Sequence, residues 1–326
     1  RRVLFRSTLD ANGNMTVTGM VCGASSNMFR NRIINGNMVI DQRNGGAQVT
    51  PNNMTNTYCV DRYSLSVSQN TKCTVQQSAG SVTPPAGFSK YYGFTSTSSY
   101  SIVAGDYFGM QQRIEGYNIA DLAWGTASAK TITVSFWVYS SLTGTFGFNL
   151  QNGAQTRSYG ATYTINSANT WQYVTITVPG DTTGSWTSDN STGIVVSWGL
   201  GVGSTYSISA TGAWQTTVSP NGFGTTGVTS VVGTNGATWY ITGVQLEVGT
   251  VATPFERRLY GHELALCQRY FFKVTNRGSR WLQTTSISSG NMYGTIPFQV
   301  NMRTVDRKST RLNSSHIPLS RMPSSA

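Results

Sequence analysis

The chain has 326 residues, of which 38% are hydrophobic, only 11% are charged and 35 are glycine. This composition is poor in helix formers and rich in turn formers, so it excludes a helical bundle and predicts an all-β protein. The formal net charge is +11, yet no cluster of Lys and Arg alternates with aromatic residues, and nucleic acid is not an expected partner. No apolar run approaches the roughly 20 residues of a membrane span, so membrane insertion is not expected.

Both ends of the chain correspond to translated sequencing adapter. Residues 1–7 read RRVLFRS, and residues 306–326 contain DRKSTRLNSSH and MPSSA, which match the two strands of a common sequencing reagent. We therefore expect both stretches to be adapter artefacts, and the natural segment to be an internal fragment of about residues 8–305. Each adapter stretch carries +3, which leaves +5 of the formal +11 for the natural segment.

The first natural residues differ in composition from the rest. Residues 8–28 combine short β-prone runs with Asn-Gly turns, which is typical of the end of a stalk or a linker. From residue 29 onward the pattern changes, and residues 29–255 are predicted to form a jelly-roll β-sandwich. In its first block, residues 31–46, Ile33, Met38 and Ile40 alternate with polar residues around an Asn-Gly turn.

Several strands follow, separated by turns at intervals of roughly 10–15 residues. They are expected at residues 61–67, 131–139, 146–150, 158–165, 171–178 and 194–202. In the clearest of them, Phe136 and Val138 face one way and Trp137 the other. Residues 219–236 are rich in glycine and threonine and are predicted to be a long surface loop.

The closing strand of the predicted sandwich leads directly to a helix. Its apolar residues form two alternating runs that slip by one residue at Thr242-Gly243, which predicts a β-bulge. Thr253, Pro254 and Glu256 then have the spacing of a capping box, so a helix is predicted over residues 256–275. Its expected apolar face consists of Leu264, Cys267 and Phe271. Residues 276–305 return to a β pattern and are predicted to begin a second, truncated β domain.

The four cysteines, Cys22, Cys59, Cys73 and Cys267, lie far apart and form no CxxC pair. Neither a zinc site nor a redox pair is indicated, and buried free thiols are expected. A Cys59–Cys73 bridge across a hairpin is the alternative. No metal ion and no cofactor is predicted.

Catalytic constellations are absent from the sequence. Between residues 8 and 305 the single histidine, His262, lies on the predicted helix, and there is no GxSxG, HExxH or P-loop motif. Asp181 and Asp189 flank Trp186 and are the best pair for glycosidase chemistry, but Pro-Gly-Asp is ordinary turn chemistry. We therefore expect no catalytic residues and no enzyme activity in this segment.

Aromatic residues in polar loops are the candidates for sugar binding, because rings stack on the apolar faces of sugars while polar neighbours bond the hydroxyls. Trp186 and Trp214 occupy such surroundings, and Arg157, Tyr159 and Asp189 are weaker additions. A tryptophan is more often a core residue than a platform. The tryptophans assigned to core or strand packing are Trp137, Trp171, Trp198 and Trp239, whereas Trp124 and Trp281 have no predicted place.

Four blocks of the sequence carry a family resemblance: residues 31–46 (NRIINGNMVIDQRNGG), 60–63 (VDRY), 170–186 (TWQYVTITVPGDTTGSW) and 241–271 (ITGVQLEVGTVATPFERRLYGHELALCQRYF). They resemble signature blocks of phage and prophage tail-fibre proteins, in which they mark a jelly-roll, carbohydrate-binding-like domain near the distal end of the fibre. The resemblance implies a homotrimeric virion protein, made in the bacterial cytoplasm, that contacts a host cell-surface polysaccharide during adsorption.

The same blocks are faintly similar to the edges of extracellular carbohydrate-binding modules, whose last strand often carries paired aspartates for a structural calcium ion. Here Thr242-Gly243 stands in that place, so no calcium site is predicted. Two alternatives to glycan binding stay open. The domain could be a purely structural or trimerisation module of the fibre, or part of a polysaccharide depolymerase whose active site lies outside this segment.

Overall fold

The computed structural model describes residues 30–53, 56–217, 222–273 and 298–303 with their side chains, and the backbone of four short strands outside these ranges. The chain divides into two units, Arg1–Arg30 and Asn31–Ala326. In the first unit, β1 (Arg6–Leu9) pairs antiparallel with β2 (Met15–Thr18). Most of the predicted stalk, residues 8–28, lies outside the described residues.

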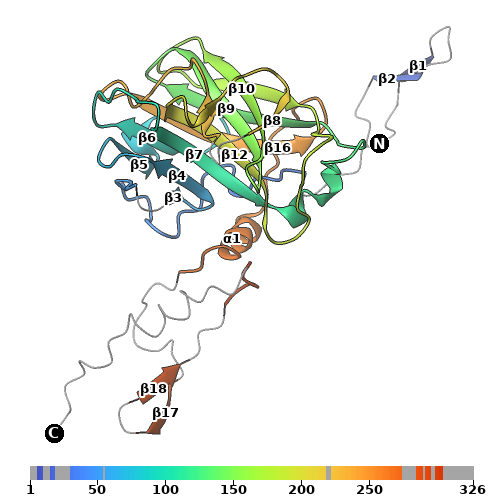
Figure 1. Cartoon of the computed structure of the whole chain (residues 1–326). Coiled ribbons are helices and arrows are strands. Elements are labelled where there is room, and N and C mark those ends of the chain that lie inside the picture. Colours follow the sequence, from blue (N-terminus) through green and yellow to red (C-terminus); the bar gives the residue numbers. More distant parts are fainter. Residues whose placement is uncertain are drawn as a thin grey trace. The chain divides into compact units, whose positions relative to one another are not determined.

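The second unit contains a sandwich of two β-sheets, as the alternation predicted (Figure 1). The larger sheet has seven strands in the order β14-β10-β9-β12-β7-β4-β3, all paired antiparallel. In chain order these strands are β3 (Thr57–Val60), β4 (Tyr63–Val67), β7 (Tyr107–Glu115), β9 (Gly144–Asn152), β10 (Arg157–Ile165), β12 (Thr192–Val202) and β14 (Trp214–Thr216).

The smaller sheet has five strands in the order β11-β8-β16-β6-β5, again antiparallel. Its strands are β5 (Cys73–Gln77), β6 (Tyr92–Ser96), β8 (Ile132–Ser140), β11 (Gln172–Val178) and β16 (Thr238–Val248). Long-range antiparallel pairing in two facing sheets, with one short α-helix among the described residues, confirms the predicted all-β jelly-roll class.

The core lies between the two sheets and is built from the inward face of each alternating strand. Phe136 of the smaller sheet contacts Phe148 and Trp198 of the larger one, with ring centroids 6.4 and 5.6 Å apart, and all three side chains are fully buried. Trp239 is also fully buried and donates its indole N–H to the hydroxyl of Tyr163. The prediction that Trp198 and Trp239 are core residues is therefore correct.

The predicted bulge in the closing strand is present. The pairing of β16 with β8 shifts register between Thr242 and Gln245, and Gly243 has a positive φ of 63°. A Cβ atom at Gly243 would lie 2.7 Å from the ring of Phe88 and 3.1 Å from that of Trp137, so only glycine fits between them. The bulge therefore shifts the pairing register, and its glycine lets the rings of Phe88 and Trp137 approach the backbone closely.

The long loop predicted for residues 219–236 is instead partly built into the fold. Two-residue strands β13 (Ser207–Ile208) and β15 (Gly224–Thr225) pair in parallel, and Val231 and Val232 are fully buried. The prediction was wrong because glycines in the sheet below leave room for this segment. At Gly109 a Cβ atom would lie 2.9 Å from the ring of Phe223.

The short 3₁₀ helices are η1 (Ala79–Ser81), η2 (Gly116–Asn118) and η3 (Ala120–Leu122).

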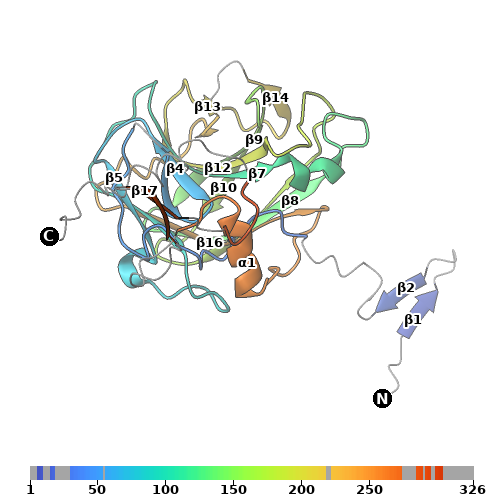
Figure 2. The ribbon, with the colours of Figure 1, turned by 90° about the horizontal axis from the view of Figure 1, so that it is seen from below.

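The helix is shorter than the predicted residues 256–275. It spans α1 (Tyr260–Gln268), and Figures 1 and 2 show it outside the sheets, at one end of the sandwich. The capping-box prediction fails because its residues bond to the closing strand: Thr253 donates to Glu247, and the backbone N–H of Glu256 donates to Gln245. Of the predicted apolar face, Cys267 is buried and Leu264 packs in the same cluster.

An ion pair and hydrogen bonds join the residues that follow α1 to the larger sheet. Glu115 is buried and accepts hydrogen bonds from the guanidinium of Arg269 at 2.7 and 3.0 Å and from the hydroxyl of Tyr270 at 2.6 Å. Arg62 lies over the Tyr270 ring at 3.3 Å. Burial would raise the pKa of Glu115, but these bonds and the charge of Arg269 outweigh it and lower the pKa. Farther along, β17 (Thr284–Ser288) pairs antiparallel with β18 (Asn291–Gly294).

Three of the four cysteines can be assessed. Cys59, Cys73 and Cys267 are free and buried, and the Cys59–Cys73 bridge is not formed. Burial raises the pKa of Cys73 to about 12, so its thiol is inert at neutral pH. Cys22 lies outside the described residues. Within the described part of the chain, no helix is long and apolar enough to cross a membrane.

Candidate functional site

The two predicted sugar-binding tryptophans meet at one edge of the sandwich. Trp214 begins the edge strand β14, opposite Tyr159 of β10, and Trp186 lies in the loop between β11 and β12. Their ring centroids are 5.3 Å apart in an edge-to-face contact. Trp124, which had no predicted place, completes the group at 4.7 Å from Trp186 and 5.2 Å from Trp214. We call Trp124, Tyr159, Trp186 and Trp214 the tryptophan corner.

Each indole N–H of the corner is used to hold a loop. Trp124 donates to the carbonyl of Lys130 at 2.7 Å, Trp214 to that of Pro179 at 2.7 Å, and Trp186 to that of Thr183 at 3.2 Å. Backbone groups therefore fix the orientation of all three rings. Trp124 is buried, whereas Trp186 and Trp214 are only half-buried.

Arg157 adds a fixed cation beside the corner. Its guanidinium forms two hydrogen bonds with the buried carboxylate of Asp181, at 2.8 and 2.7 Å, and a third with the hydroxyl of Thr216 at 3.3 Å. The hydrogen bond to Asp181 raises the pKa of Arg157. Burial would raise the pKa of Asp181, but hydrogen bonds from Arg157 and Thr183 outweigh it, and the net shift is downward.

The other two predicted residues occupy different positions. Tyr159 is buried, and its ring centroid lies 5.5 Å from that of Trp214, so it supports that ring from the core side. Asp189 is exposed, and its carboxylate accepts from the Thr187 hydroxyl and the Ser191 backbone N–H, which lowers its pKa. No contact of the described residues joins Asp189 to the corner.

The sequence analysis missed Trp124 and Asp181 as members of this site. Trp124 lies 62 residues from Trp186 in the sequence, and no spacing rule connects them. A signal exists in Gly125, which has φ 85° and where a Cβ atom would lie 2.8 Å from the Gly184 carbonyl. That contact brings the Trp124 turn against the loop of Trp186, but it becomes visible only in three dimensions.

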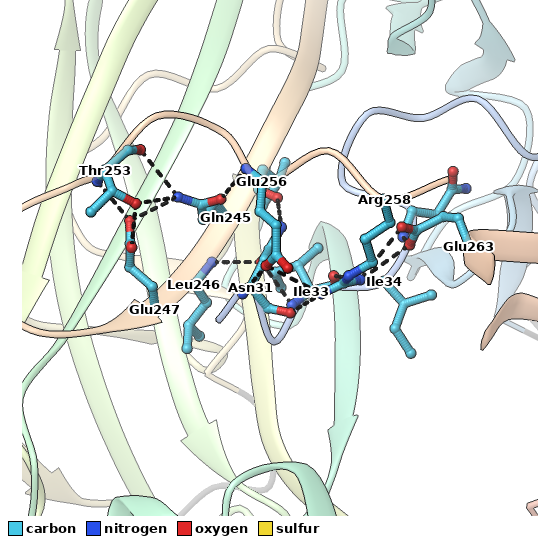
Figure 3. Close-up of polar contacts among 12 residues, drawn as sticks. Asn31, Ile33, Ile34, Gln245, Leu246, Glu247, Thr253, Glu256, Arg258 and Glu263 are labelled. Atoms are coloured by element: carbon cyan, nitrogen blue, oxygen red, sulfur yellow. Dashed lines mark hydrogen bonds and ion pairs between the residues drawn. The ribbon is translucent and has the colours of Figure 1, made fainter. Parts of the chain in front are cut away.

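A second polar cluster joins the start of the sandwich to its end (Figure 3). The side chain of Asn31 accepts from the backbone N–H of Leu246 at 3.0 Å and donates to the carbonyl of Val244 at 3.1 Å. The backbone N–H of Arg32 donates to the carbonyl of Leu246 at 2.8 Å. Residues 31–36 therefore run along the bulged part of β16, and two of the four resemblance blocks meet there.

Arg258 is the centre of this cluster, which we call the junction. Its guanidinium donates to the carbonyls of Asn31 and Ile33 and forms an ion pair with Glu263 at 3.3 Å. The carboxylate of Glu256 accepts from the backbone N–H of Asn31 at 2.6 Å. These charges are paired and nearly buried, so the junction is a structural fastening and offers no open site.

Neither cluster has the composition of a metal centre. Among the described residues, no group of three or more His, Cys, Asp or Glu side chains could hold a metal ion. What the corner offers is apolar ring surface, one fixed guanidinium and nearby hydroxyls. That combination suits binding of a neutral polar molecule with an apolar face.

Comparison with known proteins gave matches among solved structures alone, because no protein-family model and no curated protein matches the chain. The enzymatically active domain of tailspike protein 4 from bacteriophage CBA120 is similar with a TM-score of 0.36 and 12% identity, over 68% of this chain and 22% of that chain. The chain thus spans about a fifth of that solved tailspike domain.

Two carbohydrate-binding modules are similar over nearly their whole length. For a CBM4 module the TM-score is 0.33 with 13% identity, over 66% of this chain and 98% of that chain. The family 11 module of Clostridium thermocellum in complex with a mixed-linked tetrasaccharide has a TM-score of 0.31 and 9% identity, over 63% of this chain and 98% of that chain. Similarity at these TM-scores does not indicate what this chain binds.

Proposed function

We propose that this protein is a non-enzymatic component of a phage tail fibre that binds a host cell-surface glycan during adsorption. The observation that carries the proposal is the tryptophan corner. Trp186 and Trp214 are only half-buried, and hydrogen bonds to backbone carbonyls fix both in place. Rings fixed in advance lose little conformational entropy when a sugar stacks on them.

The polar groups beside the rings supply orientation. Arg157 is held by Asp181, and its guanidinium borders the hydroxyl of Thr216. A pyranose ring that stacks on Trp214 would present its equatorial hydroxyls to these groups. Because the carboxylate of Asp181 is already occupied, we expect the contacts with sugar hydroxyls to come from Arg157 and Thr216.

The carboxylates near the corner are unsuited to glycosidic bond cleavage, which supports a binding role. A general acid needs a raised pKa so that it carries a proton at neutral pH. The pKa values of Asp181 and Asp189 are both lowered, and each carboxylate is bonded to its own surroundings. Under this proposal, any depolymerase activity of the fibre would belong to residues outside this segment.

The tail-fibre part of the proposal is supported by the sequence blocks, which resemble those of phage fibres. It places the protein in the virion, outside the cell, after synthesis in the bacterial cytoplasm. Homotrimer formation belongs to the same proposal. Each trimer would then present three copies of the corner, and binding to a repetitive polysaccharide would gain avidity.

The test is binding of purified residues 8–305 to a panel of bacterial surface polysaccharides, with Trp186→Ala and Trp214→Ala variants beside it. We expect saturable binding that either substitution weakens at least about tenfold, since aromatic anchors commonly dominate such interfaces. Tyr117→Ala is the matched control, because that ring is 63% exposed and lies outside the corner. Unchanged binding in both tryptophan variants would contradict the proposed site.

A structural role in assembly is the second candidate, favoured by apolar side chains around the start of α1. Leu259 is 83% exposed, Val251 72% and Tyr260 62%, although each is a large hydrophobic residue. Two further copies of this chain are the proposed occupants of this surface. A Leu259→Glu, Tyr260→Ser double variant should be monomeric by light scattering, whereas Val103→Asp at another exposed site should leave the oligomer unchanged.

A further inference from the structure

The outer face of the smaller sheet carries a second group of aromatic residues that the proposed function does not use. Trp137 of β8 points away from the core, because its neighbours Phe136 and Val138 are fully buried between the sheets. Tyr173 pairs with it across the strands, and their ring centroids are 5.2 Å apart. On the other side Phe88 and Trp137 both border Gly243, and the ring centroids of Phe255 and Phe88 are 5.2 Å apart. We call Tyr173, Trp137, Phe88 and Phe255 the aromatic strip.

Part of this face is covered by the chain itself. The segment around η1 packs on Tyr91 and Tyr240, and Trp171 donates its N–H to the carbonyl of Thr83. The strip lies beside this covered part and stays accessible. Tyr173 is 43% exposed, and the other three side chains are half-buried.

Trp137 differs from the other described tryptophans in its indole N–H. The N–H groups of Trp124, Trp171, Trp186, Trp214 and Trp239 all donate to protein groups, and that of Trp198 is buried without a partner. The N–H of Trp137 has no partner among the described residues and is not a buried atom. It is therefore a donor available to a ligand.

A cation borders the strip, and a lysine lies nearby in the chain. The guanidinium of Arg257 lies 4.9 Å from the Phe88 ring centroid and 5.7 Å from that of Phe255. Lys90 is exposed, and its carbonyl accepts from Thr242, the residue opposite Trp137. Within the described part of the chain, neither cation takes part in a salt bridge. The nearby carboxylates, Glu247 and Glu256, are instead bonded to the chain.

We propose that the aromatic strip is a second saccharide-binding surface, and that its ligand is an acidic polysaccharide. The rings of Trp137 and Tyr173 would stack on sugar C–H faces, and the free indole N–H would donate to a hydroxyl or ring oxygen. Arg257 would pair with a carboxylate of the sugar chain. An uncharged sugar would leave the guanidinium of Arg257 without a charged partner, so charge complementarity favours the acidic class.

The strip is separate from the tryptophan corner. Tyr173 lies near the start of β11, whereas Pro179, which accepts from Trp214, follows its end. Six residues of extended strand span about 20 Å. Loss of binding at one surface can therefore be measured without disturbing the other.

The test uses residues 8–305 and calorimetric titration with oligomers of galacturonate, mannuronate and sialic acid, together with methyl-esterified oligogalacturonate as the neutral match. We expect saturable binding of at least one acidic oligomer, at least about tenfold weaker binding for Trp137→Ala and Arg257→Ala, and weaker binding in high salt. Trp137→Phe keeps a ring and removes the N–H, so its affinity should fall between those of wild type and Trp137→Ala.

Two controls separate this inference from the proposed function. Arg113→Ala removes an exposed arginine from the other sheet and should leave acidic binding unchanged, and Trp214→Ala should do the same. If only the corner variants lose binding, the strip is not a site, and the proposed function stands alone. No binding of any acidic oligomer by the folded chain, or equal binding by Trp137→Ala, would overturn the inference.

Discussion

In the tryptophan corner every indole N–H donates to a backbone carbonyl, whereas in the aromatic strip the N–H of Trp137 has no partner in the described chain. The corner holds irregular loops together, so its rings serve packing first and binding second. The rings of Trp137 and Tyr173 are positioned by paired strands and need no such bonds. The same residue type therefore carries a stability role in one region and is free for ligands in the other.

Trp124→Ala should have the largest effect on this comparison. The ring is buried and contacts both other tryptophans of the corner, so its removal leaves a cavity and frees the carbonyl of Lys130. We expect a loss of about 3–5 kcal/mol in the free energy of unfolding, measured by urea denaturation. A loss below about 1 kcal/mol would show that the corner is not a packing unit.

Arg157→Ala should cost about 2–4 kcal/mol at neutral pH, because it leaves the carboxylate of Asp181 buried and unpaired. In the wild type the pKa of Asp181 is lowered, so the stability from this pair is present above the unfolded pKa of about 4 and is lost as pH falls through the folded value. In the variant the two contributions of Arg157 are lost, so the pKa of Asp181 should be lowered less and less of the stability should depend on pH.

The difference in melting temperature between wild type and Arg157→Ala should therefore shrink as pH falls from about 6 to 3. Lys130→Ala is the control, because Lys130 is exposed and its side chain makes no described ion pair. Its difference in melting temperature from wild type should stay constant over the same pH range. A difference that stays constant for Arg157→Ala would show that the pair does not couple folding to pH.

Gly243→Ala tests how the strip is built. The substitution places a Cβ atom at a positive φ and within 3.1 Å of both Phe88 and Trp137. We expect a loss of about 2–3 kcal/mol by urea denaturation, together with a shift in Trp137 fluorescence. Gly212→Ala is the matched control, because that glycine has φ 70° and no atom within 4 Å of its Cβ position.

Trp137→Ala should have the smallest effect on stability, about 0.5–1 kcal/mol, because the side chain is only half-buried, on the outer face of the sheet, and its ring pairs with the exposed Tyr173. The measurement is the same urea titration that is used for Trp124→Ala. Equal losses for the two variants would remove the distinction between corner and strip.

The sandwich could be predicted from the sequence because period-two alternation records which side of a strand is buried. Residues 131–139 illustrate this. The slip of one residue in the alternation at Thr242-Gly243 likewise predicted the bulge. The start of the helix could not be predicted from the sequence. Thr253 and Glu256 have the spacing of a capping box, but they bond to Glu247, Gln245 and Asn31. Local spacing cannot reveal that a strand distant in sequence offers better partners.

The candidate sites followed the same rule. Trp186 and Trp214 were chosen as candidates from their polar surroundings, whereas Trp124 was not, because the contact that joins it to them depends on tertiary structure. Trp137 was assigned to core or strand packing. Its backbone is indeed paired within the sheet on both sides, as the alternation with Phe136 and Val138 predicts. Its exposure depends on how far the segment around η1 extends over the sheet, and the sequence pattern carries no record of that.

The junction has a consequence for how such a domain is inherited. Asn31, where the chain joins the sandwich, bonds to Arg258 and Glu256, which follow the last strand. A domain whose first and last residues touch can be inserted into a longer chain, or exchanged for another, without displacing the flanking segments. Recombination could therefore exchange the whole sandwich as one unit while the flanking segments stay intact.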